Sequence, residues 1–373
     1  MIYFDNAATT KYKPDSVYEA FMHYAKDIGV SPGRGSYSAG IEASRMLFNC
    51  RKVVGKYFGL GNNNVVFTKN STEAINLFFN GFLCKGDHVI ISCYEHNAVL
   101  RPLQLLKENG VIEYSVIDRD DLELSPNEIL LKYKRENTKL LAITLASNLT
   151  GRKVFNEELI RCAKKQGIYT FVDSSQGAGK IPVSMKEQSI DYLAFTGHKD
   201  LLGLPGVGGL CCSEKGMVKP LIQGGTGVLG DSYTNPDVFP EGLEAGTLNM
   251  PAIWALKTAI EYCSDKRDEI VAKEKELTKY LIDKLKSIEE IIIYDEQYER
   301  VSTVGINVKG KASSKIVELL DENNICTRGG IHCAILAHEA LFTKEVGVVR
   351  ISLSANNTKE EIDTLIEVLE KCR

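Results

Sequence analysis

Short apolar runs alternate with helix-like segments between about residues 50 and 213. The segment 73–83, which follows the first of these runs, has a helical pattern. Strands that are apolar throughout are typical of sheets buried on both faces, and the helices between them join parallel neighbours. The pattern therefore predicts an α/β fold with a mostly parallel sheet. The apolar runs are 65–68, 87–92, 140–146, 168–173, 191–196 and 207–212.

The pattern changes near residue 250, after a glycine-rich segment at 223–227. Residues 252–287 have the charged, amphipathic pattern of long helices. Shorter segments that follow predict a smaller α+β domain. We therefore predict a large domain over 15–249 and a small domain over 250–373 that also includes 1–14. The short segments are strands near 301–308 and 347–353 and helices near 313–322 and 359–371.

Composition narrows the classes of function. Hydrophobic residues make up 44% and charged residues 25% of the chain, and the net charge of −4 gives no reason to expect nucleic acid or an anionic membrane as a partner. No run reaches the ~18 apolar residues of a membrane span, and no export signal precedes the ten scattered cysteines. We therefore expect a cytoplasmic protein with reduced thiols and a small-molecule substrate.

Lys199 and Asp173 form the pair of residues that points most directly to chemistry. Each follows an apolar run, and parallel strands place such positions at the same edge of a sheet, where ligands bind. A lysine amine at this edge can carry pyridoxal 5'-phosphate as a Schiff base, and an aspartate can pair with its protonated pyridine nitrogen. Burying Asp173 without a cationic partner would be costly, and the pyridinium supplies one.

Three further residues fit the phosphate of that cofactor and the carboxylate of an amino acid bound to it. Ser71 and Thr72 open a helix after the strand at 65–68, so their N–H groups and hydroxyls can hold a phosphate, although an ordinary helix cap has the same sequence. Arg350 lies within an apolar strand of the small domain, where its planar fork matches a carboxylate. A structural ion pair is the alternative for Arg350.

The chain resembles the class V aminotransferase family of fold-type I pyridoxal phosphate enzymes, and within it the SufS-type cysteine desulfurases and selenocysteine lyases. The resemblance implies a seven-stranded large domain with a smaller α+β domain, and a homodimer. Its motifs are spread over nearly the whole chain, with Asp173 and Gln176 between them and Arg350 after the last. They are FDNAATT (4–10), NSTEA (70–74), EHNA (95–98), SN (147–148), TGHK (196–199), EAGT (244–247) and RGGIHCA (328–334).

The resemblance also implies a role for each matching residue. His96 would stack on the cofactor ring and relay protons, and Lys199 would be both cofactor anchor and general base. The phosphate would be held by Ser71, Thr72, Thr196 and His198, and by Thr247 from the partner subunit. Asn148 and Gln176 would hydrogen-bond the cofactor. The substrate would contact Ala8, Asn148, Arg328 and Arg350.

Cys333 determines which reaction is expected. An aminotransferase needs no thiol, whereas a desulfurase needs a nucleophilic cysteine that takes the substrate sulfur as a persulfide. Arg328 and His332 are cationic or polarisable neighbours that would favour the Cys333 thiolate. We therefore expect L-cysteine to be converted to L-alanine. Release of selenium from L-selenocysteine is the close alternative, followed by a class V aminotransferase or epimerase, and by a catalytically idle cofactor-binding scaffold or sulfur carrier.

Other interpretations of these segments are weaker. Cys326, His332, Cys333 and His338 lack the ligand spacing of a structural zinc site, and the glycine-rich 203–209 precedes a strand rather than linking a strand to a helix, so we expect neither a metal nor a dinucleotide. The chain also departs from the family: Asp200 follows the lysine, Leu204 stands where proline is common, the lead-in before the first motif is short, and 33–37 lacks histidines. The departures leave open the substrate and a protein acceptor of sulfur or selenium, for iron-sulfur assembly, tRNA thiolation or selenium delivery.

Overall fold

The large domain is built on a seven-stranded sheet. A computed structural model describes residues 1–33, 35, 37–61 and 64–371, so Arg34, Ser36 and Cys372 lie outside the described residues. The sheet order is β2-β8-β7-β6-β5-β3-β4, and only β8 runs antiparallel to its neighbours, which confirms the predicted fold class. The strands are β2 Val65–Thr68, β3 Asp87–Ser92, β4 Ile112–Ile117, β5 Thr138–Thr144, β6 Tyr169–Asp173, β7 Tyr192–Thr196 and β8 Gly208–Cys212.

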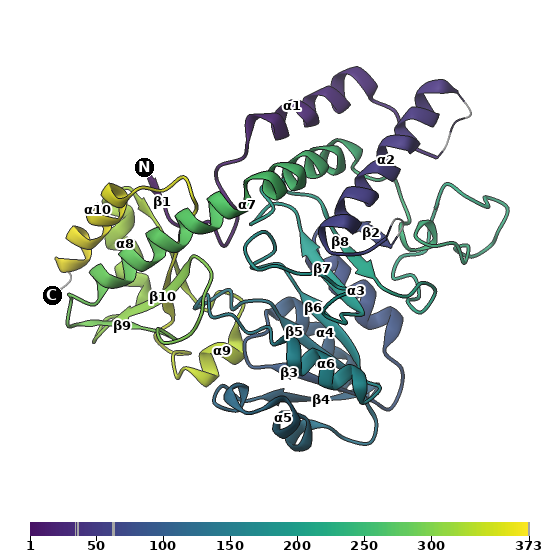
Figure 1. Cartoon of the computed structure of the whole chain (residues 1–373). Helices are drawn as coiled ribbons and strands as arrows, with labels where there is room; N and C mark the ends of the chain where they lie inside the picture. Colours follow the sequence, from purple (N-terminus) through teal and green to yellow (C-terminus); the bar gives the residue numbers. More distant parts are fainter. Residues whose placement is uncertain (34, 36, 62–63, 372–373) are drawn as a thin grey trace.

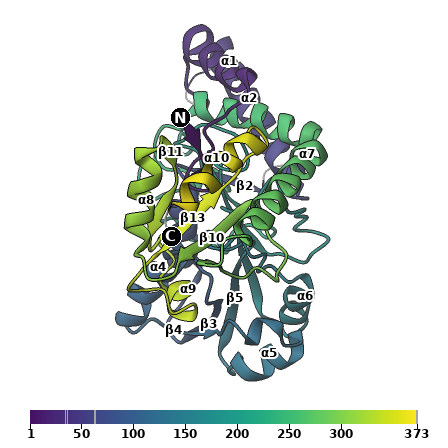
Figure 2. The same cartoon turned by 90° about the vertical axis from the view of Figure 1, so that its left-hand side faces the viewer.

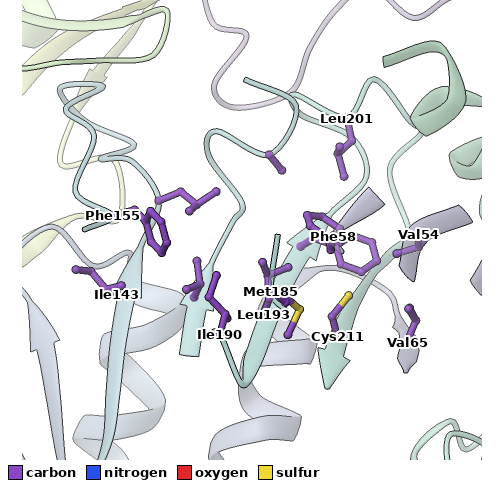
Figure 3. Close-up of a cluster of buried hydrophobic side chains, with 14 of the residues drawn as sticks. Val54, Phe58, Val65, Ile143, Phe155, Met185, Ile190, Leu193, Leu201 and Cys211 are labelled. Atoms are coloured by element: carbon purple, nitrogen blue, oxygen red, sulfur yellow. The ribbon is translucent and has the colours of Figure 1, made fainter. Parts of the chain in front are cut away.

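Helices bury both faces of this sheet (Figure 1). Successive residues of a strand point to opposite faces. In β7, Leu193 and Phe195 join the hydrophobic core beneath one set of helices, and Tyr192 and Ala194 join the core beneath the other. This two-sided burial explains the uninterrupted apolar runs, and Figure 3 shows part of the first core. The helices are α2 Ser38–Tyr57, α5 Pro126–Tyr133 and α6 Glu157–Lys165 on the first face, and α3 Ser71–Phe82 and α4 Asn97–Glu108 on the second.

One long helix, α7 (Met250–Leu285), connects the two halves of the chain. Its first part contacts α1 (Asp15–His23) and α2, and its second part contacts the small sheet and α10 (Lys359–Glu370) (Figure 1). The boundary that the sequence predicts near residue 250 therefore coincides with the start of a helix that both halves share. No helix of the described residues has the length and apolar character that crossing a membrane requires.

The small sheet is antiparallel and has the order β12-β13-β10-β9. Its own hydrophobic core includes Phe4 from the N-terminal segment. That segment also contributes β1 (Ile2–Tyr3), which pairs with β11 (Ile325–Cys326). Figure 2 faces this domain, with α8 and α10 beside the sheet. The remaining elements are β9 Ile291–Ile293, β10 Thr303–Val308, β12 Arg328–Gly330, β13 Val348–Ser352, α8 Ser313–Glu322 and α9 Ile335–Ala340.

Candidate active site

A cavity of about 290 Å³ lies at the carboxyl ends of β5, β6 and β7. Strands that run in parallel bring these ends together, as the sequence analysis expects. Ten of the fourteen predicted site residues line the cavity, and Arg328, Cys333, Arg350 and Thr247 do not. The ten are Ala8, Ser71, Thr72, His96, Asn148, Asp173, Gln176, Thr196, His198 and Lys199; the other lining residues are Asn70, Thr144, Ala146 and Ser175.

Lys199 and Asp173 face this cavity from adjacent strands. Burial lowers the pKa of Lys199, and the nearby Asp173 carboxylate acts in the opposite direction. Asp173 is 3% exposed, and its Oδ1 accepts hydrogen bonds from the backbone N–H and the hydroxyl of Ser175. A lysine amine that loses its proton readily is a nucleophile and a base, so this pair can carry the chemistry that its sequence positions predict.

One end of the cavity is suited to an anion. Asn70 caps α3 by accepting a hydrogen bond from Glu73 N, so the helix begins at Ser71 with its N–H groups toward the cavity end. Among the described residues, Thr196 Oγ1 and His198 Nδ1 are buried without a hydrogen-bond partner. Because unpaired buried polar atoms are costly, this pair of orphaned atoms beside a helix start fits a phosphate group.

His96 caps α4 from the loop after β3. Its Nδ1 accepts a hydrogen bond from Ala98 N at 3.0 Å, which leaves the ring proton on Nε2. Burial lowers the pKa of His96 to about 4, and the charge of Lys199 adds to this effect. The imidazole is therefore neutral at physiological pH.

Glu95, beside His96, is a buried carboxyl whose importance the sequence analysis did not anticipate. Its Oε1 accepts hydrogen bonds from Ser92 Oγ (2.6 Å) and Thr144 N (2.9 Å), whereas Oε2 has no partner among the described residues. Burial raises the pKa of Glu95 to about 8. The side chain is thus protonated at neutral pH, and its position next to His96 within the EHNA motif was the available signal.

A Glu95→Gln variant is expected to become more stable relative to the wild type as pH rises. The folded-state pKa lies above that of the unfolded chain, so the wild type loses stability between about pH 4.5 and pH 8, by up to roughly 4 kcal/mol. Denaturant unfolding of both proteins from pH 5 to pH 9 measures this difference. The exposed Glu158→Gln serves as control, and an equal difference at pH 5 and pH 8 would contradict the expectation.

Arg350 lies in β13, close to the cavity. It is 2% exposed; its Nη2 donates to Asp5 Oδ1 at 2.6 Å and its Nη1 to the Asn148 carbonyl oxygen at 3.0 Å. The Nε has no partner among the described residues. Arg328 lies directly opposite Arg350 on the neighbouring strand β12. The ion pair that the sequence analysis kept as an alternative is therefore present, with Asp5, yet N–H groups remain for a second carboxylate.

The loop that carries Cys333 is fixed to the same site. His332 and Cys333 adopt positive φ angles of 52° and 55°. The Cys333 carbonyl accepts a hydrogen bond from Asn97 N, and the His332 carbonyl accepts one from Asn148 Nδ2, both at 2.7 Å. Residues that flank or line the cavity thus hold the loop that carries Cys333, and Cys333 itself is only partly buried.

His332 is not a cation in this arrangement. Burial lowers the pKa of His332 to about 3, and its Nε2 lies 2.8 Å from the Val348 carbonyl oxygen, to which it donates. Of the two neighbours that the sequence analysis named for Cys333, only Arg328 therefore brings a charge. Among the described residues, no three His, Cys, Asp or Glu side chains are grouped as a metal ion would require.

The N-terminal segment holds the backbone around Lys199. The His198 carbonyl accepts hydrogen bonds from Lys13 Nζ (2.8 Å) and Thr9 Oγ1 (3.1 Å), and the Lys199 carbonyl accepts one from Thr10 Oγ1 (2.8 Å). Gln176 Nε2 donates to the Ala7 carbonyl at 2.8 Å. These contacts are not predictable from the sequence, because hydrogen bonds to main-chain carbonyls leave no signal in the residue pattern.

Thr247 lies apart from the Lys199 cavity. It is exposed, and it lines two other cavities beside Glu244. Glu244 is buried; it forms a two-fold ion pair with Arg51 (2.6 and 2.7 Å) and accepts a hydrogen bond from Phe67 N. The segment that carries Thr247 is therefore anchored firmly, but outside the site of its own chain.

Comparisons with known proteins agree with this geometry. Residues 2–365 match the family described as aminotransferase class-V. A "Probable cysteine desulfurase" of Methanothermobacter thermautotrophicus is 34% identical and covers 99% of this chain and 94% of its own length. A "Cysteine desulfurase" of Yersinia pestis is 29% identical, with 100% of this chain and 93% of the relative covered.

Solved structures show the same similarity. A cysteine desulfurase from Thermococcus onnurineus, in its apo form, superposes with a TM-score of 0.91 at 31% identity and covers 100% of this chain and 94% of its own. A cysteine desulfurase from Escherichia coli gives a TM-score of 0.87 at 27% identity, with 99% and 94% covered. The similarity therefore extends over both domains.

Proposed function

The chain belongs to the aminotransferase class-V family, and we propose that within this family it is a cysteine desulfurase that converts L-cysteine to L-alanine and keeps the sulfur as a persulfide on Cys333. One observation carries the proposal: Asn148 lines the Lys199 cavity and holds the Cys333 loop through the His332 carbonyl. A cysteine whose loop is held by a residue of the lysine–aspartate cavity is the feature that separates a desulfurase from an aminotransferase.

The cavity fits pyridoxal 5'-phosphate. The N-terminus of α3 with the orphaned Thr196 and His198 atoms suits the phosphate, Lys199 suits the aldehyde, and Asp173 suits the pyridinium nitrogen. When bound, the cofactor supplies an electron-accepting ring for the pair of electrons left at the substrate Cα. A neutral His96 beside the cavity is compatible with stacking on that ring.

Residues of this chain bind the substrate and remove its Cα proton. The N–H groups of Arg350 that Asp5 and Asn148 leave free bind the substrate α-carboxylate, and Arg328 adds charge from the opposite strand. This contact orients the Cα–H bond toward Lys199, whose lowered pKa suits it to remove the proton.

Sulfur transfer then occurs between two thiols. Cys333 Sγ, as thiolate, forms a bond to the substrate Sγ while the substrate Cβ–Sγ bond breaks, so sulfur is oxidised and the Cβ carbon is reduced. The Cβ and Cα carbons each take up a proton to give L-alanine. No external oxidant or reductant is needed for this step, whereas release of the persulfide needs an acceptor thiol or a reductant.

The function is tested by measuring products from purified, cofactor-loaded protein. L-cysteine should give L-alanine and, with a thiol reductant, an equal amount of sulfide. Without reductant, one extra sulfur should remain on the peptide that carries Cys333, as judged by mass. L-selenocysteine is measured in parallel. Formation of alanine only when a keto acid is supplied would instead identify an aminotransferase.

Thr247 supports the further proposal of a homodimer. Its exposed position away from the Lys199 cavity of its own chain suits a residue that completes the site of a second copy. The acceptor of the persulfide, a small thiol or a protein, would reach Cys333 at its partly exposed loop.

Subunit mixing is expected to reveal a shared site. Thr247→Glu places a carboxylate against the phosphate, and Lys199→Ala removes the base, so each pure variant should be inactive. A mixed dimer has one site in which both residues are intact, so refolding the two variants together should restore about a quarter of wild-type activity by random pairing. A mixture that stays inactive would place Thr247 in the site of its own chain. As a control, two preparations of Lys199→Ala are refolded together and should remain inactive.

A further inference from the structure

Asp200, the unexpected residue after Lys199, points away from the cofactor cavity. Its side chain is 6% exposed and does not line that cavity. Its Oδ2 accepts a hydrogen bond from Gly177 N at 2.8 Å, and its Oδ1 lies 2.8 Å from Lys180 Nζ. Gly177 and Lys180 belong to the segment that follows Asp173. The Asp200 carboxylate therefore links the segment that follows Lys199 to the segment that follows Asp173.

Lys180 links this carboxylate to the second domain. Its Nζ lies 2.9 Å from Glu274 Oε2 on α7 and donates to Ser302 Oγ at 2.7 Å. We call this group the Lys180 cluster; its members are Lys180, Asp200, Glu274 and Ser302. The last three residues each place one acceptor next to the Lys180 ammonium group, which has three hydrogens to donate. One buried ammonium between two carboxylates leaves a net negative charge, and burial raises the pKa of Glu274.

The cluster continues to the strand that carries Arg350. The Ser302 hydroxyl lies 2.7 Å from Glu274 Oε2 and 3.0 Å from the Leu353 carbonyl oxygen, and Leu353 N donates to the Ser302 carbonyl at 2.8 Å. Leu353 follows β13, which contains Arg350. A short series of contacts therefore connects the lysine that takes the proton with the strand that binds the carboxylate.

Asp200 also acts on Lys199 electrostatically. Burial lowers the pKa of Lys199, and the Asp200 carboxylate raises it. Lys180 brings a positive charge next to Asp200, so removing Lys180 and removing Asp200 are expected to shift the pKa of Lys199 in opposite directions. The other charged or titratable groups around Lys199 are Asp173, Arg328, Arg350, His96 and His198. Those around Asp200 are Lys13, Tyr57, Cys263, Lys180 and Glu274.

We propose that Lys180 is a positioning residue of the desulfurase reaction: it fixes the place and the effective charge of Asp200 behind Lys199, and it ties both to the substrate-binding domain through Glu274 and Ser302. The proposal rests on the function proposed above, because it assigns Lys199 as the base. It goes beyond that function by giving a role to a residue outside the cavity.

The test follows the visible absorption band of the substrate-free, cofactor-loaded enzyme against pH. Asp200→Asn is expected to lower the midpoint of this titration and Lys180→Met to raise it, each by about 1 pH unit. Lys180→Arg keeps the charge and should restore the wild-type midpoint. Glu274→Gln weakens the contacts of Lys180 and Ser302 with α7. It should raise KM for cysteine more than it lowers kcat, with little change in the midpoint.

The control is Lys284→Met, which removes a lysine of α7 paired at the surface with Asp363 and should leave the midpoint unchanged. Shifts of Asp200→Asn and Lys180→Met in the same direction, or no shift in either, would overturn the proposal and leave the cluster a purely structural one. If Lys180→Met does not fold, the proposal is still tested by the other two variants: Asp200→Asn should lower the midpoint and Lys180→Arg should keep the wild-type midpoint.

A second readout separates this proposal from the proposed function. The rate at which acetic anhydride acetylates Lys199 in cofactor-free protein, followed by mass over a range of pH, reports the titration of the free amine, whose midpoint should shift in the same directions without any turnover. If the midpoint of this rate shifts in opposite directions in Asp200→Asn and Lys180→Met, but cysteine gives no alanine, the effect of Lys180 and Asp200 on Lys199 is supported and the desulfurase function is rejected. Normal desulfurase activity with unshifted midpoints in both variants would support the desulfurase function and reject the positioning role of Lys180.

Discussion

Replacing Lys199 by alanine is expected to abolish turnover of cysteine, with a fall of at least about 10³-fold. In the proposed function the amine is both the covalent anchor of the cofactor and the base for the Cα proton, and no other lysine lines the cavity among the described residues. The visible band of the cofactor–lysine bond should disappear, and borohydride should no longer trap the cofactor on the protein.

The fold should survive this change, since alanine removes a side chain that faces a cavity rather than one that fills a core. Thermal unfolding of Lys199→Ala should therefore stay close to that of the wild type in its cofactor-free form. Lys186→Ala, at an exposed position, is the matched control and should keep both band and activity. Trapping of the cofactor on Lys199→Ala would refute the assignment of the anchor.

Replacing Cys333 by alanine is expected to have the second largest effect. Cysteine turnover should fall at least about 100-fold, since the thiol that forms the new bond to sulfur is gone. The cofactor band should remain and should still respond to added cysteine, because binding and proton removal do not involve Cys333. Mass spectrometry should find no added sulfur on the peptide.

Cys326→Ala is the matched control, because Cys326 is also a partly buried thiol of the small domain and lies on β11 near the same loop. It should retain activity. Selenocysteine provides the discriminating substrate, because selenium leaves more readily than sulfur. Continued turnover of selenocysteine by Cys333→Ala would point to a lyase that does not need the thiol, whereas unchanged cysteine turnover would remove Cys333 from the mechanism.

The sequence predicts the central strands and the edge strand β2 well, but it misses the other edge strand, β4. β6 and β7 are buried on both faces, so their apolar runs stand out and their predicted ends fall within a residue of the observed ones. Edge strand β4 is only partly buried and has a mixed pattern, IEYSVI, so it was not predicted.

The candidate site shows the same division. Lys199 and Asp173 were predictable because the ends of parallel strands must meet at one edge of the sheet, and His96 was predicted from the family resemblance; all three line one cavity. The partners of buried charges were not predictable in this way. Asp5 lies 345 residues from Arg350, and its ion pair forms only because residues 1–5 pack beside β13.

By itself, the sequence determined the α/β fold and the family, and it predicted a cofactor site and the thiol that a desulfurase would need, because side-chain chemistry and strand periodicity are local properties of a chain. Only the tertiary structure decided that Arg350 pairs with Asp5, that His332 is neutral, and that Asp200 turns toward Lys180. Charge state and pairing depend on burial and on neighbours brought together by folding, and neither is encoded in the spacing of residues.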